Sequence, residues 1–386
     1  MNIYLSFFQS QINHPIPAYS FWEYYIKNGI EEGGYEWQEG DVDWAEGLMY
    51  SADEEKLSKW KAETWEKTVK DIQLKHSNKP ISFFLSYLYP HQIDEHAIKA
   101  IQKMGIPCVN FFCDNVREFT KAPKEFAVFD LNWVPEFKAI GMYNKANYNH
   151  INLPMPMWVA PENRKKSIIE TNDVSFIGSK DIQRLYLFEE IVEKGVNVSI
   201  YGSGWKGAGE LTKWVNKIES GGIQQKLLNQ VEFLKRFGLV GFYRKMQQKN
   251  MQIGISPSLN RCLKGKPTFD EYITITKESA VTLGINRYPS YRYPINNPNT
   301  YSRLRDIEAP MLGACYLTEW TEGIDEMYML GEEIEIYRNA DELIVKAEHL
   351  LKNKMKREAL RQAGQERALN FHCIQKSLYK IKMKLA

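Results

Sequence analysis

The sequence predicts an α/β protein built from two doubly wound domains, each with a mostly parallel sheet. Short apolar segments of strand length alternate with helical segments through most of the 386 residues. The alternation is interrupted once, over residues 150–172, where Pro154, Pro156 and Pro161 precede a polar run. The length fits two or three domains of roughly 150 residues each.

These observations set the expected domain boundaries. We expect a first domain over residues 1–160 and a second over residues 161–365. Residues 366–386 are expected to form a helix that crosses back to the first domain. We find no internal repeat at a fixed period, so the two domains resemble each other only in their alternating pattern.

The first domain is expected to alternate as follows. Its apolar segments predict strands over residues 2–8, 81–88, 106–112 and 128–134. Helices are expected over residues 19–26 and 51–74, and another is expected to begin at its cap, Asp94, and to end at Gly105.

The second domain repeats the alternation. Strands are expected over residues 174–177, 196–201, 281–285, 315–317 and 334–337. Helices are expected over residues 182–194, 271–279, 301–312, 324–330, 340–351 and 355–385. Residues 206–270 contain helical stretches but give no clear strand pattern.

Composition excludes several classes of protein. The 50 basic and 48 acidic residues give a net charge of +2, too balanced for a protein that grips nucleic acid through its phosphates. No apolar run reaches the length of about 18 residues that a membrane-spanning helix needs. The first residues lack the basic segment of a signal peptide. Five scattered cysteines without a Cys-x-x-Cys pair predict reduced thiols, a cytoplasmic location and no metal site.

In doubly wound sheets, ligands bind outside the carboxyl ends of the strands, so the residues that follow each strand are the candidates. Gly202, Gly204 and Gly207 follow a predicted strand with the spacing of a dinucleotide-binding loop. That spacing is also found in ordinary tight turns, and in loops that contact a nucleotide or sugar without NAD chemistry. The three interpretations stay open, although the position on the second strand of its domain disfavours NAD.

The most informative stretch begins at Thr300. Thr300, Tyr301 and Ser302 lie where a helix is expected to begin, and the free N–H groups of a helix start suit a diphosphate. Arg305 adds a fixed positive charge one turn later. Glu308 lies on the same helical face and could accept hydrogen bonds from two ribose hydroxyls. The alternative is an ion pair on a solvated helix face.

These residues carry a resemblance to a known family. The run from Arg305 to Glu319 resembles the C-terminal signature of CgeB-like glycosyltransferases, which have the GT-B fold and are related to the retaining enzymes of family 4. Gly178-Ser179 and Gly202–Trp205 fit the same pattern, and the resemblance covers about residues 170–375. It implies two Rossmann-like domains facing a central cleft, with a nucleotide-sugar donor site in the second domain.

The resemblance also implies roles for individual residues. Glu308 would hold the donor ribose, and the Thr300–Ser302 turn would hold the diphosphate with Arg305. Across from the phosphates would lie Gly178 and Ser179 with Lys180 or Arg184, and the loop of Gly202, Gly204 and Trp205 would border the base. Family 4 enzymes carry a second Glu eight residues before the ribose Glu, and this chain has Thr300 there. That departure leaves the donor sugar and the stereochemistry open.

The chemistry that the resemblance implies needs few further groups. A helix start and basic side chains can stabilise a leaving diphosphate, so we expect neither a metal ion nor a cofactor. If transfer inverts the anomeric centre, a general base is required in the first domain, and Asp114, His14 and His91 are the candidates. Each of these three could equally be a structural loop residue. If transfer retains the anomeric configuration, no enzymic base is required.

The sequence therefore predicts a glycosyltransferase acting on a glycan, lipid-linked or protein acceptor. A non-catalytic glycan-binding or assembly protein and a nucleotide-sugar epimerase are the alternatives, and Thr300 favours the first of them. The basic stretch from Lys352 to Lys384 is either a solvated helix face or a contact with anionic lipid at the inner face of the membrane.

Overall fold

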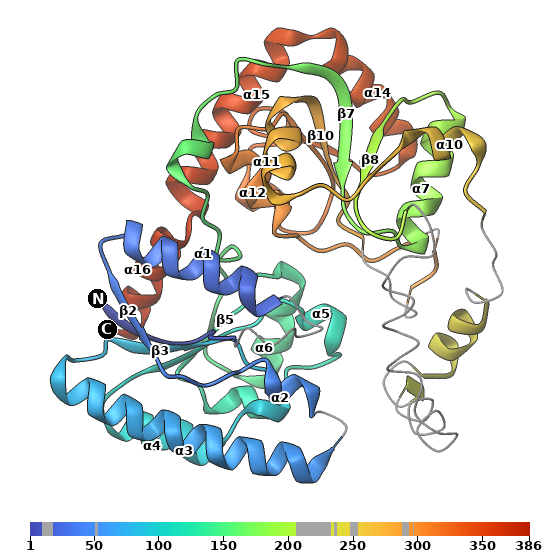
Figure 1. The fold of residues 1–386 in the computed structure, drawn as a ribbon. Helices are drawn as coiled ribbons and strands as arrows, with labels where there is room; N and C mark the ends of the chain where they lie inside the picture. Colours follow the sequence, from blue (N-terminus) through green and yellow to red (C-terminus); the bar gives the residue numbers. More distant parts are fainter. Residues whose placement is uncertain are drawn as a thin grey trace. The chain divides into compact units, whose positions relative to one another are not determined.

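The computed structural model describes residues 1–9, 18–50, 53–205, 233–234, 238–247, 254–287, 293–295 and 297–386. Its internal contacts divide the chain into two units. The first unit consists of Met1–Ala160 together with Ala368–Ala386, and the second of Pro161–Arg367. Each unit contains its own parallel sheet with helices on both faces (Figure 1).

In the described part of the first unit, the sheet has the strand order β2-β1-β3-β4-β5-β6, and every neighbouring pair is parallel. Side chains of β1, β3, β4 and β5 are buried along their whole length, as expected for a parallel sheet covered on both faces. The strands are β1 (Asn2–Ser6), β2 (Glu36–Glu39), β3 (Phe83–Ser86), β4 (Cys108–Phe111), β5 (Leu131–Trp133) and β6 (His150–Ile151).

Helices α3 and α4 lie against one face of this sheet, and α1 with α16 covers the other (Figure 1). The side chain of Asp94 caps α4 by accepting the Ala97 N–H at 3.0 Å, as the sequence predicts. The helices are α1 (Ala18–Glu32), α2 (Glu46–Met49), α3 (Glu54–Asn78), α4 (Glu95–Lys103), α5 (Asn115–Glu118), α6 (Ile140–Ala146) and α16 (Ile374–Leu385). Short 3-10 helices are η1 (Pro90–Gln92), η2 (Lys124–Val128) and η3 (Phe137–Ala139), and η5 (Ala368–His372) is a π-helix.

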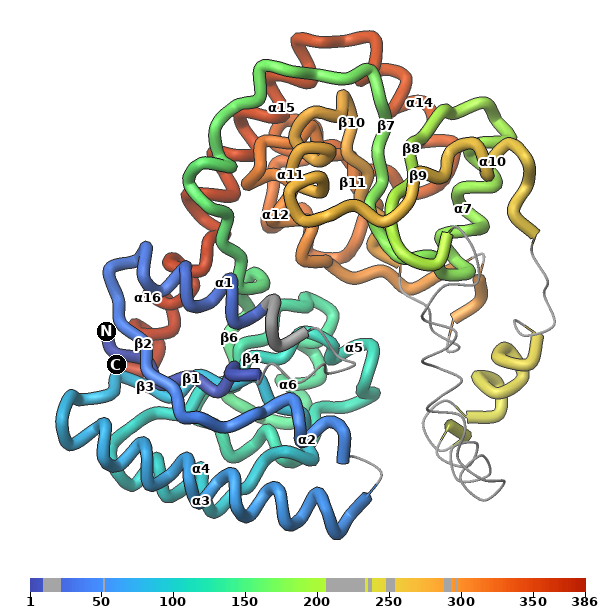
Figure 2. The backbone as a smooth tube through the Cα atoms, viewed as in Figure 1, coloured from blue at the N-terminus to red at the C-terminus, as the bar shows by residue number. Residues whose placement is uncertain are grey.

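Helix α16 lies beside α1, although the two are separated by most of the chain (Figure 2). Gly29 of α1 and Gly33, just after the end of α1, make this close packing possible. A Cβ atom at Gly29 would lie 2.0 Å from Cγ2 of Ile374, and one at Gly33 would lie 3.2 Å from Cγ of Gln375. Because a larger residue at Gly29 would overlap Ile374, this glycine fixes where α16 can pack.

In the described part of the second unit, the sheet has the strand order β12-β11-β10-β7-β8-β9, again with parallel neighbours. A hydrophobic core packed against this sheet contains Phe176, Phe188, Leu283 and Leu343. The strands are β7 (Thr171–Ile177), β8 (Ser199–Tyr201), β9 (Leu263–Gly265), β10 (Ser279–Gly284), β11 (Tyr316–Glu319) and β12 (Glu335–Tyr337).

Three helices of the second unit begin at the following polar caps. Asp181 caps α7, Thr268 caps α11 in a capping box with Glu271, and Asn339 caps α14. The elements are η4 (Pro161–Arg164), α7 (Ile182–Glu193), α10 (Pro257–Cys262), α11 (Phe269–Glu278), α12 (Arg305–Met311), α13 (Ile324–Met327), α14 (Ala340–Lys352) and α15 (Lys354–Arg367). Among the residues that the structure describes, no helix is long and apolar enough to cross a bilayer.

The expected helix over residues 301–312 is wrong at its start. The helix begins at Arg305, four residues later than expected, and ends at Met311. Strands β2, β6 and β9 were not expected from the sequence, because they are short or lack a run of apolar residues.

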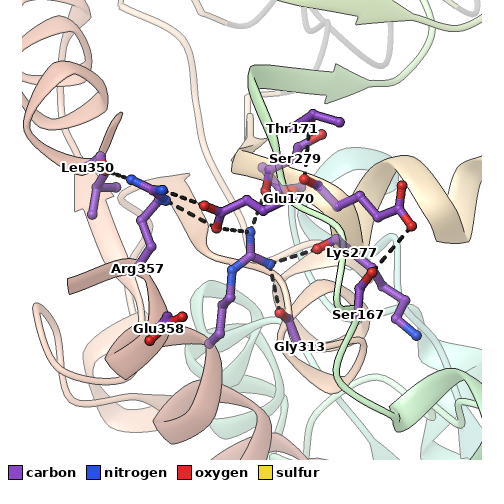
Figure 3. Close-up of polar contacts among 12 residues, drawn as sticks. Ser167, Glu170, Thr171, Lys277, Ser279, Gly313, Leu350, Arg357 and Glu358 are labelled. Atoms are coloured by element: carbon purple, nitrogen blue, oxygen red, sulfur yellow. Dashed lines mark hydrogen bonds and ion pairs between the residues drawn. The ribbon is translucent and has the colours of Figure 1, made fainter. Parts of the chain in front are cut away.

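An ionic cluster lies at the amino-terminal edge of the second sheet and holds the neighbouring helices to it (Figure 3). Glu170, just before β7, pairs with Arg357 and with Arg361, whose Nη2 lies 3.3 Å from the Glu170 carboxylate. Arg361 also donates to the carbonyls of Lys277 and Gly313, at 2.8 and 3.0 Å. Helix α15 is thereby tied to the end of α11 and to the loop before β11.

Arg357 extends this cluster to α14. Its Nη1 donates to the carbonyls of Leu350 and Leu351 at 2.7 and 2.9 Å, the last turn of that helix (Figure 3). The Arg357 side chain is only 8% exposed, so removal of Glu170 would leave a poorly compensated buried charge.

We expect Glu170→Gln to lower the free energy of unfolding at neutral pH by about 1.5–3 kcal/mol, the range for a hydrogen bond to a charged group. Hydrogen bonds from Arg357 lower the pKa of Glu170 below its ordinary value of 4.5. The carboxylate therefore contributes stability above that pH and loses it as the pH falls through the depressed folded pKa. Urea unfolding from pH 7 downward should show the difference between wild type and variant shrinking.

Glu358→Gln is the matched control for this prediction. Glu358 lies next to Arg357 on α15. Its side chain is 46% exposed, and its carboxylate lies 3.8 Å from Nζ of Lys166. Its replacement should change stability by less than about 1 kcal/mol. Equal losses in the two variants would contradict the role given to Glu170.

Candidate functional site at the carboxyl edge of the second sheet

Two loops run side by side where β7 and β8 end. The Gly178 N–H donates to the Tyr201 carbonyl at 2.8 Å, and the Lys180 N–H donates to the Ser203 carbonyl at 2.9 Å. The sequence singled out both loops, and the pairing of their strands brings them together. The two candidate segments therefore form one continuous surface at the carboxyl edge.

Glycine is required at one point of this surface. Gly202 has φ +134°, and a Cβ atom there would lie 2.2 Å from the carbonyl oxygen of Gly178. Gly204 has φ +79°, which also favours glycine. Trp205 braces the loop from below: its side chain is 2% exposed, its indole N–H donates to the Gly178 carbonyl at 2.7 Å, and its ring packs on Phe188. The indole thus belongs to the core of the second unit.

Arg184 folds back onto the first of these loops. Asp181 accepts from the N–H groups of Gln183 and Arg184 at the start of α7, which fixes the base of the arginine. Nη1 of Arg184 donates to the Ser179 carbonyl at 2.7 Å, and Nε lies 3.1 Å from Asp181. Its guanidinium therefore lies directly beside the Gly178–Ser179 loop.

Further positive charge lies near Arg184. Burial lowers the pKa of Arg184 to about 10, and the charges of Arg303 and Arg305 lower it as well, against the opposing effect of Asp181. Arg303 is connected to the start of α7 through Arg287: its Nη2 donates to the Arg287 carbonyl at 3.1 Å, and Nη1 of Arg287 donates to the Gln183 carbonyl at 3.3 Å. Arg303 was not predicted from the sequence.

The turn that precedes α12 is held by the loop after β10. Thr300 pairs with Arg287 in an isolated antiparallel bridge, and the Tyr301 N–H donates to the Asn286 carbonyl at 3.2 Å. Thr300, Tyr301 and Ser302 therefore lie before the helix rather than in its first turn, which corrects the expectation. The Tyr301 side chain is buried, with the Arg303 guanidinium 4.4 Å from its ring centre.

A fully buried carboxylate, Asp306, fixes this turn. Its Oδ1 accepts from the hydroxyls of Tyr316 and Thr318 at 2.8 and 3.0 Å and from Nδ2 of Asn286 at 3.3 Å. Its Oδ2 accepts from the backbone N–H of Arg303 at 2.9 Å. Burial raises the pKa of Asp306 above its ordinary value, although the hydrogen bonds from Arg303, Tyr316 and Thr318 oppose this. The carboxylate ties the turn to the ends of β10 and β11.

Glu308 is buried on α12, with 4% of its surface exposed. The Tyr272 hydroxyl of α11 donates to its Oε2. Burial, followed by the negative charge of Glu308, raises the pKa of Tyr272, so the phenol stays protonated as a donor. The guanidinium of Arg305 lies 5.2 Å from the centre of the Tyr272 ring. Tyr272 thus orients both residues that the sequence singled out, and nothing in the spacing along the chain indicated it.

A buried ion pair closes the end of β11. Nε of Arg287 donates to Glu319 at 3.0 Å, and the backbone N–H groups of Asn286 and Arg287 donate to the same carboxylate at 3.1 Å. Nη1 of Arg287 reaches the Gln183 carbonyl at 3.3 Å, which connects the pair to α7. Because the carboxylate of Glu319 neutralises its charge, Arg287 holds the surrounding loops in place and adds little to the net positive charge of the site.

Several buried polar atoms at this edge have no hydrogen-bond partner within the described residues. They include both side-chain amide atoms of Gln183 and Nε of Arg303. Native proteins pair nearly all such groups with protein, water or ligand. A polar ligand beside Arg184 and Arg303 would supply acceptors, so the donor set suits an anion that carries hydroxyl or phosphate groups.

The first unit holds the remaining candidates at the carboxyl edge of its own sheet. His91 lies in η1 after β3, its Nε2 is buried without a partner among described residues, and burial lowers its pKa. Asp114 follows β4 and lies 3.8 Å from Nη1 of Arg117. His14 lies outside the described residues.

A buried acid beside Asp114, Glu136, was not predicted from the sequence. Glu136, after β5, is completely buried and accepts from the N–H groups of Asn115 and Val116 at 2.6 and 3.3 Å. Burial, followed by the charge of Asp114, raises the pKa of Glu136 well above its ordinary value. Because Glu136 caps the short helix that begins beside Asp114, it holds that candidate base in place.

Clustered metal ligands are not found in the described parts of the chain: no three His, Cys, Asp or Glu side chains gather in the arrangement that a metal ion requires. Asp41 and Asp43 have the two-residue spacing of a carboxylate pair that can hold a metal ion. Oδ1 of Asp43, however, already accepts from the N–H groups of Ala45 and Glu46 at 3.0 and 3.2 Å.

Two parallel sheets with helices on both faces and loops gathered at their carboxyl edges define the class: this is the GT-B fold of glycosyltransferases. The chain resembles sucrose-phosphate synthase from Thermosynechococcus elongatus (10% identity, 100% of this chain and 98% of that chain covered, TM-score 0.55). It resembles Anabaena Alr3699/HepE, solved with UDP and glucose (11% identity, 100% and 99% covered, TM-score 0.55). It also resembles a glycosyltransferase from Rickettsia africae (9% identity, 100% and 98% covered, TM-score 0.55).

Sequence comparison identifies the family. The glycosyl transferase-like family matches residues 184–381, just over half of the chain. The chain belongs to this family, and it is a glycosyltransferase. No curated protein sequence matches it.

The contact between the two loops can be tested at Gly202. In Gly202→Ala, strain from the positive φ costs about 1–3 kcal/mol, and the overlap with Gly178 adds to it. Gly195→Ala is the matched control, because Gly195 has φ +92° but an added Cβ there would meet no atom within 4 Å. Urea unfolding should show a larger loss in Gly202→Ala than in Gly195→Ala. Losses of the same size would mean that the two loops are not in contact.

Proposed function

We propose that this glycosyltransferase takes its sugar from a nucleotide-diphosphate donor bound at the carboxyl edge of the second sheet. The observation that carries the proposal is the guanidinium of Arg184 on the Ser179 carbonyl, with Arg303 held at the same edge by Arg287 and with Arg305 and the buried carboxylate of Glu308 on one helix. Structures of the similar Anabaena protein hold UDP with glucose, and UDP-glucose.

Each residue has a role in this proposal. Arg184, Arg303 and Arg305 bind the diphosphate, with N–H groups of the Gly178–Ser179 loop opposite. Glu308 accepts hydrogen bonds from the ribose hydroxyls, and Tyr272 holds its carboxylate in place. The loop of Gly202 and Gly204 borders the base, with Trp205 as its buried support.

Transfer breaks the bond between the sugar and the diphosphate, and negative charge develops on the leaving group. Fixed guanidinium groups in a partly dry site stabilise that charge without reorganisation. This makes transfer independent of a metal ion and of a cofactor in our proposal. The resemblance of residues 305–319 to CgeB-like enzymes supports the same assignment.

The first unit supplies the acceptor side in this proposal, and the acceptor is a glycan, a lipid-linked sugar or a protein. If the reaction inverts the anomeric centre, Asp114, His91 or His14 takes the proton of the acceptor hydroxyl. Thr300 replaces the Glu of family 4, so the contact to the donor sugar has to come from another residue. We place the enzyme in the cytoplasm, where nucleotide sugars are available, with peripheral contact to the membrane through its basic C-terminal helices.

Donor binding is tested first by thermal unfolding with UDP, GDP, CDP, dTDP, their sugars and NAD. A ligand at about 100 times its dissociation constant stabilises the folded state by about 2.7 kcal/mol. We expect one diphosphate and its sugar to raise the melting temperature. A shift with NAD alone would overturn the proposal, and a shift with no nucleotide would favour the non-catalytic glycan-binding alternative.

Turnover of the donor found in that screen tests the residues. Arg305→Ala and Glu308→Ala should each abolish release of the nucleotide diphosphate without changing the fold, because each removes a donor contact. Arg261→Ala, which changes an exposed arginine of α10, should keep wild-type turnover. Full activity in both site variants at subsaturating and saturating donor would refute the assignment. Conversion of the donor into an isomer without an acceptor would identify an epimerase instead.

A further inference from the structure

The outer face of α16 combines positive charge with exposed apolar groups. One face of the helix is buried through Ile374, Ser377, Leu378 and Ile381. On the opposite face, Tyr379 and Met383 lie one turn apart and are 54% and 59% exposed. These two side chains lie in the middle of the outer face, as far from the buried stripe as helical geometry allows.

Lysines flank this apolar centre on both sides. The exposed lysines of the helix are Lys376, Lys380, Lys382 and Lys384, and Ile374–Leu385 contains no acidic residue. Successive side chains along an α-helix are turned by about 100°. Lys376 and Lys380 therefore lie on one side of Tyr379 and Met383, with Lys384 beyond them, while Lys382 lies on the other. No side-chain ammonium group of these four lysines forms an ion pair or hydrogen bond with any residue that the structure describes.

We propose that this face of α16 binds an anionic lipid surface, with Tyr379 and Met383 entering the interface and the lysines contacting lipid phosphates. The arrangement has the pattern of an interfacial helix, whose apolar stripe is bordered by basic side chains that reach the headgroups. A partner recognised by charge alone, such as nucleic acid, would not favour a tyrosine and a methionine at the centre of the face. The partner that fits this face is therefore a negatively charged bilayer.

Because of this geometry, the protein loses little conformational entropy when it binds the surface. Helix α16 is already folded against α1, where Gly29 admits Ile374, so no segment has to order when the surface binds. The two halves of the interaction are separable. The lysines provide attraction that depends on anionic lipid and on salt, and the apolar pair provides insertion that salt does not screen.

Flotation of the full chain with lipid vesicles tests the inference. We expect binding when about a third of the phosphatidylcholine is replaced by phosphatidylglycerol, and little binding to phosphatidylcholine alone. Replacing all four lysines of α16 with glutamine should weaken binding at least about tenfold. Tyr379→Ser combined with Met383→Ser should weaken it as well, and should leave a residual binding that disappears in high salt.

The matched control removes the same charge elsewhere in the first unit. Lys56, Lys59, Lys67 and Lys70 are exposed on α3, and their replacement by glutamine should leave vesicle binding unchanged. Equal loss in the two lysine variants would show that only net charge matters and would overturn the proposal. Wild-type binding by the Tyr379/Met383 variant would overturn it too, as would binding that is indifferent to anionic lipid. Circular dichroism and thermal unfolding establish that each variant is folded. Because the assay contains neither donor nor acceptor, its outcome is independent of the proposed transfer reaction.

Discussion

The carboxylate of Asp306 determines the shape of the candidate donor site. Its two oxygens accept from Tyr316, Thr318, Asn286 and the backbone of Arg303, which belong to β11, to the loop after β10 and to the turn before α12. A buried carboxylate is costly unless its oxygens are satisfied, so these donors have to be in place together. This arrangement also determines the positions of Arg303, Arg305 and Glu308, because they lie on the turn and the helix that Asp306 holds in place.

The same edge of the sheet depends on a second constraint, the close approach of two loops. Parallel pairing of β7 and β8 brings Gly178 and Gly202 to the same level, and the missing side chain of Gly202 lets their backbones meet. Trp205 fills the space beneath and donates to the Gly178 carbonyl. The loops are therefore held from the core, while Arg184 folds over Ser179 and contributes charge at this edge.

The opposite edge of the sheet uses charge differently. There Glu170 is bound by Arg357 and Arg361, and the two arginines use their remaining N–H groups on backbone carbonyls (Figure 3). Such arginines are fully engaged and hold helices together. Arg303, by contrast, keeps a buried Nε without a partner among described residues, which is the state expected of a group that awaits a ligand. The contrast separates structural arginines from candidate binding arginines within one unit.

Much of the fold was determined by the sequence itself. Apolar strands alternating with capped helices are local patterns, and a residue such as Asp94 acts on an N–H group only three positions away. From the sequence, the carboxyl-edge rule selected the Gly202 loop, the expected helix start selected Arg305 and Glu308, and the family resemblance selected Gly178. What only the tertiary structure decided are contacts between distant segments. The hydroxyl of Tyr272 on α11 binds Glu308 on α12, and Glu170 binds Arg357, which is 187 residues away along the chain. The start of α12 was decided in the same way: Asn286 and Asp306 hold residues 300–303 out of the helix, because buried polar groups have to be paired and the pairing partners come from other strands.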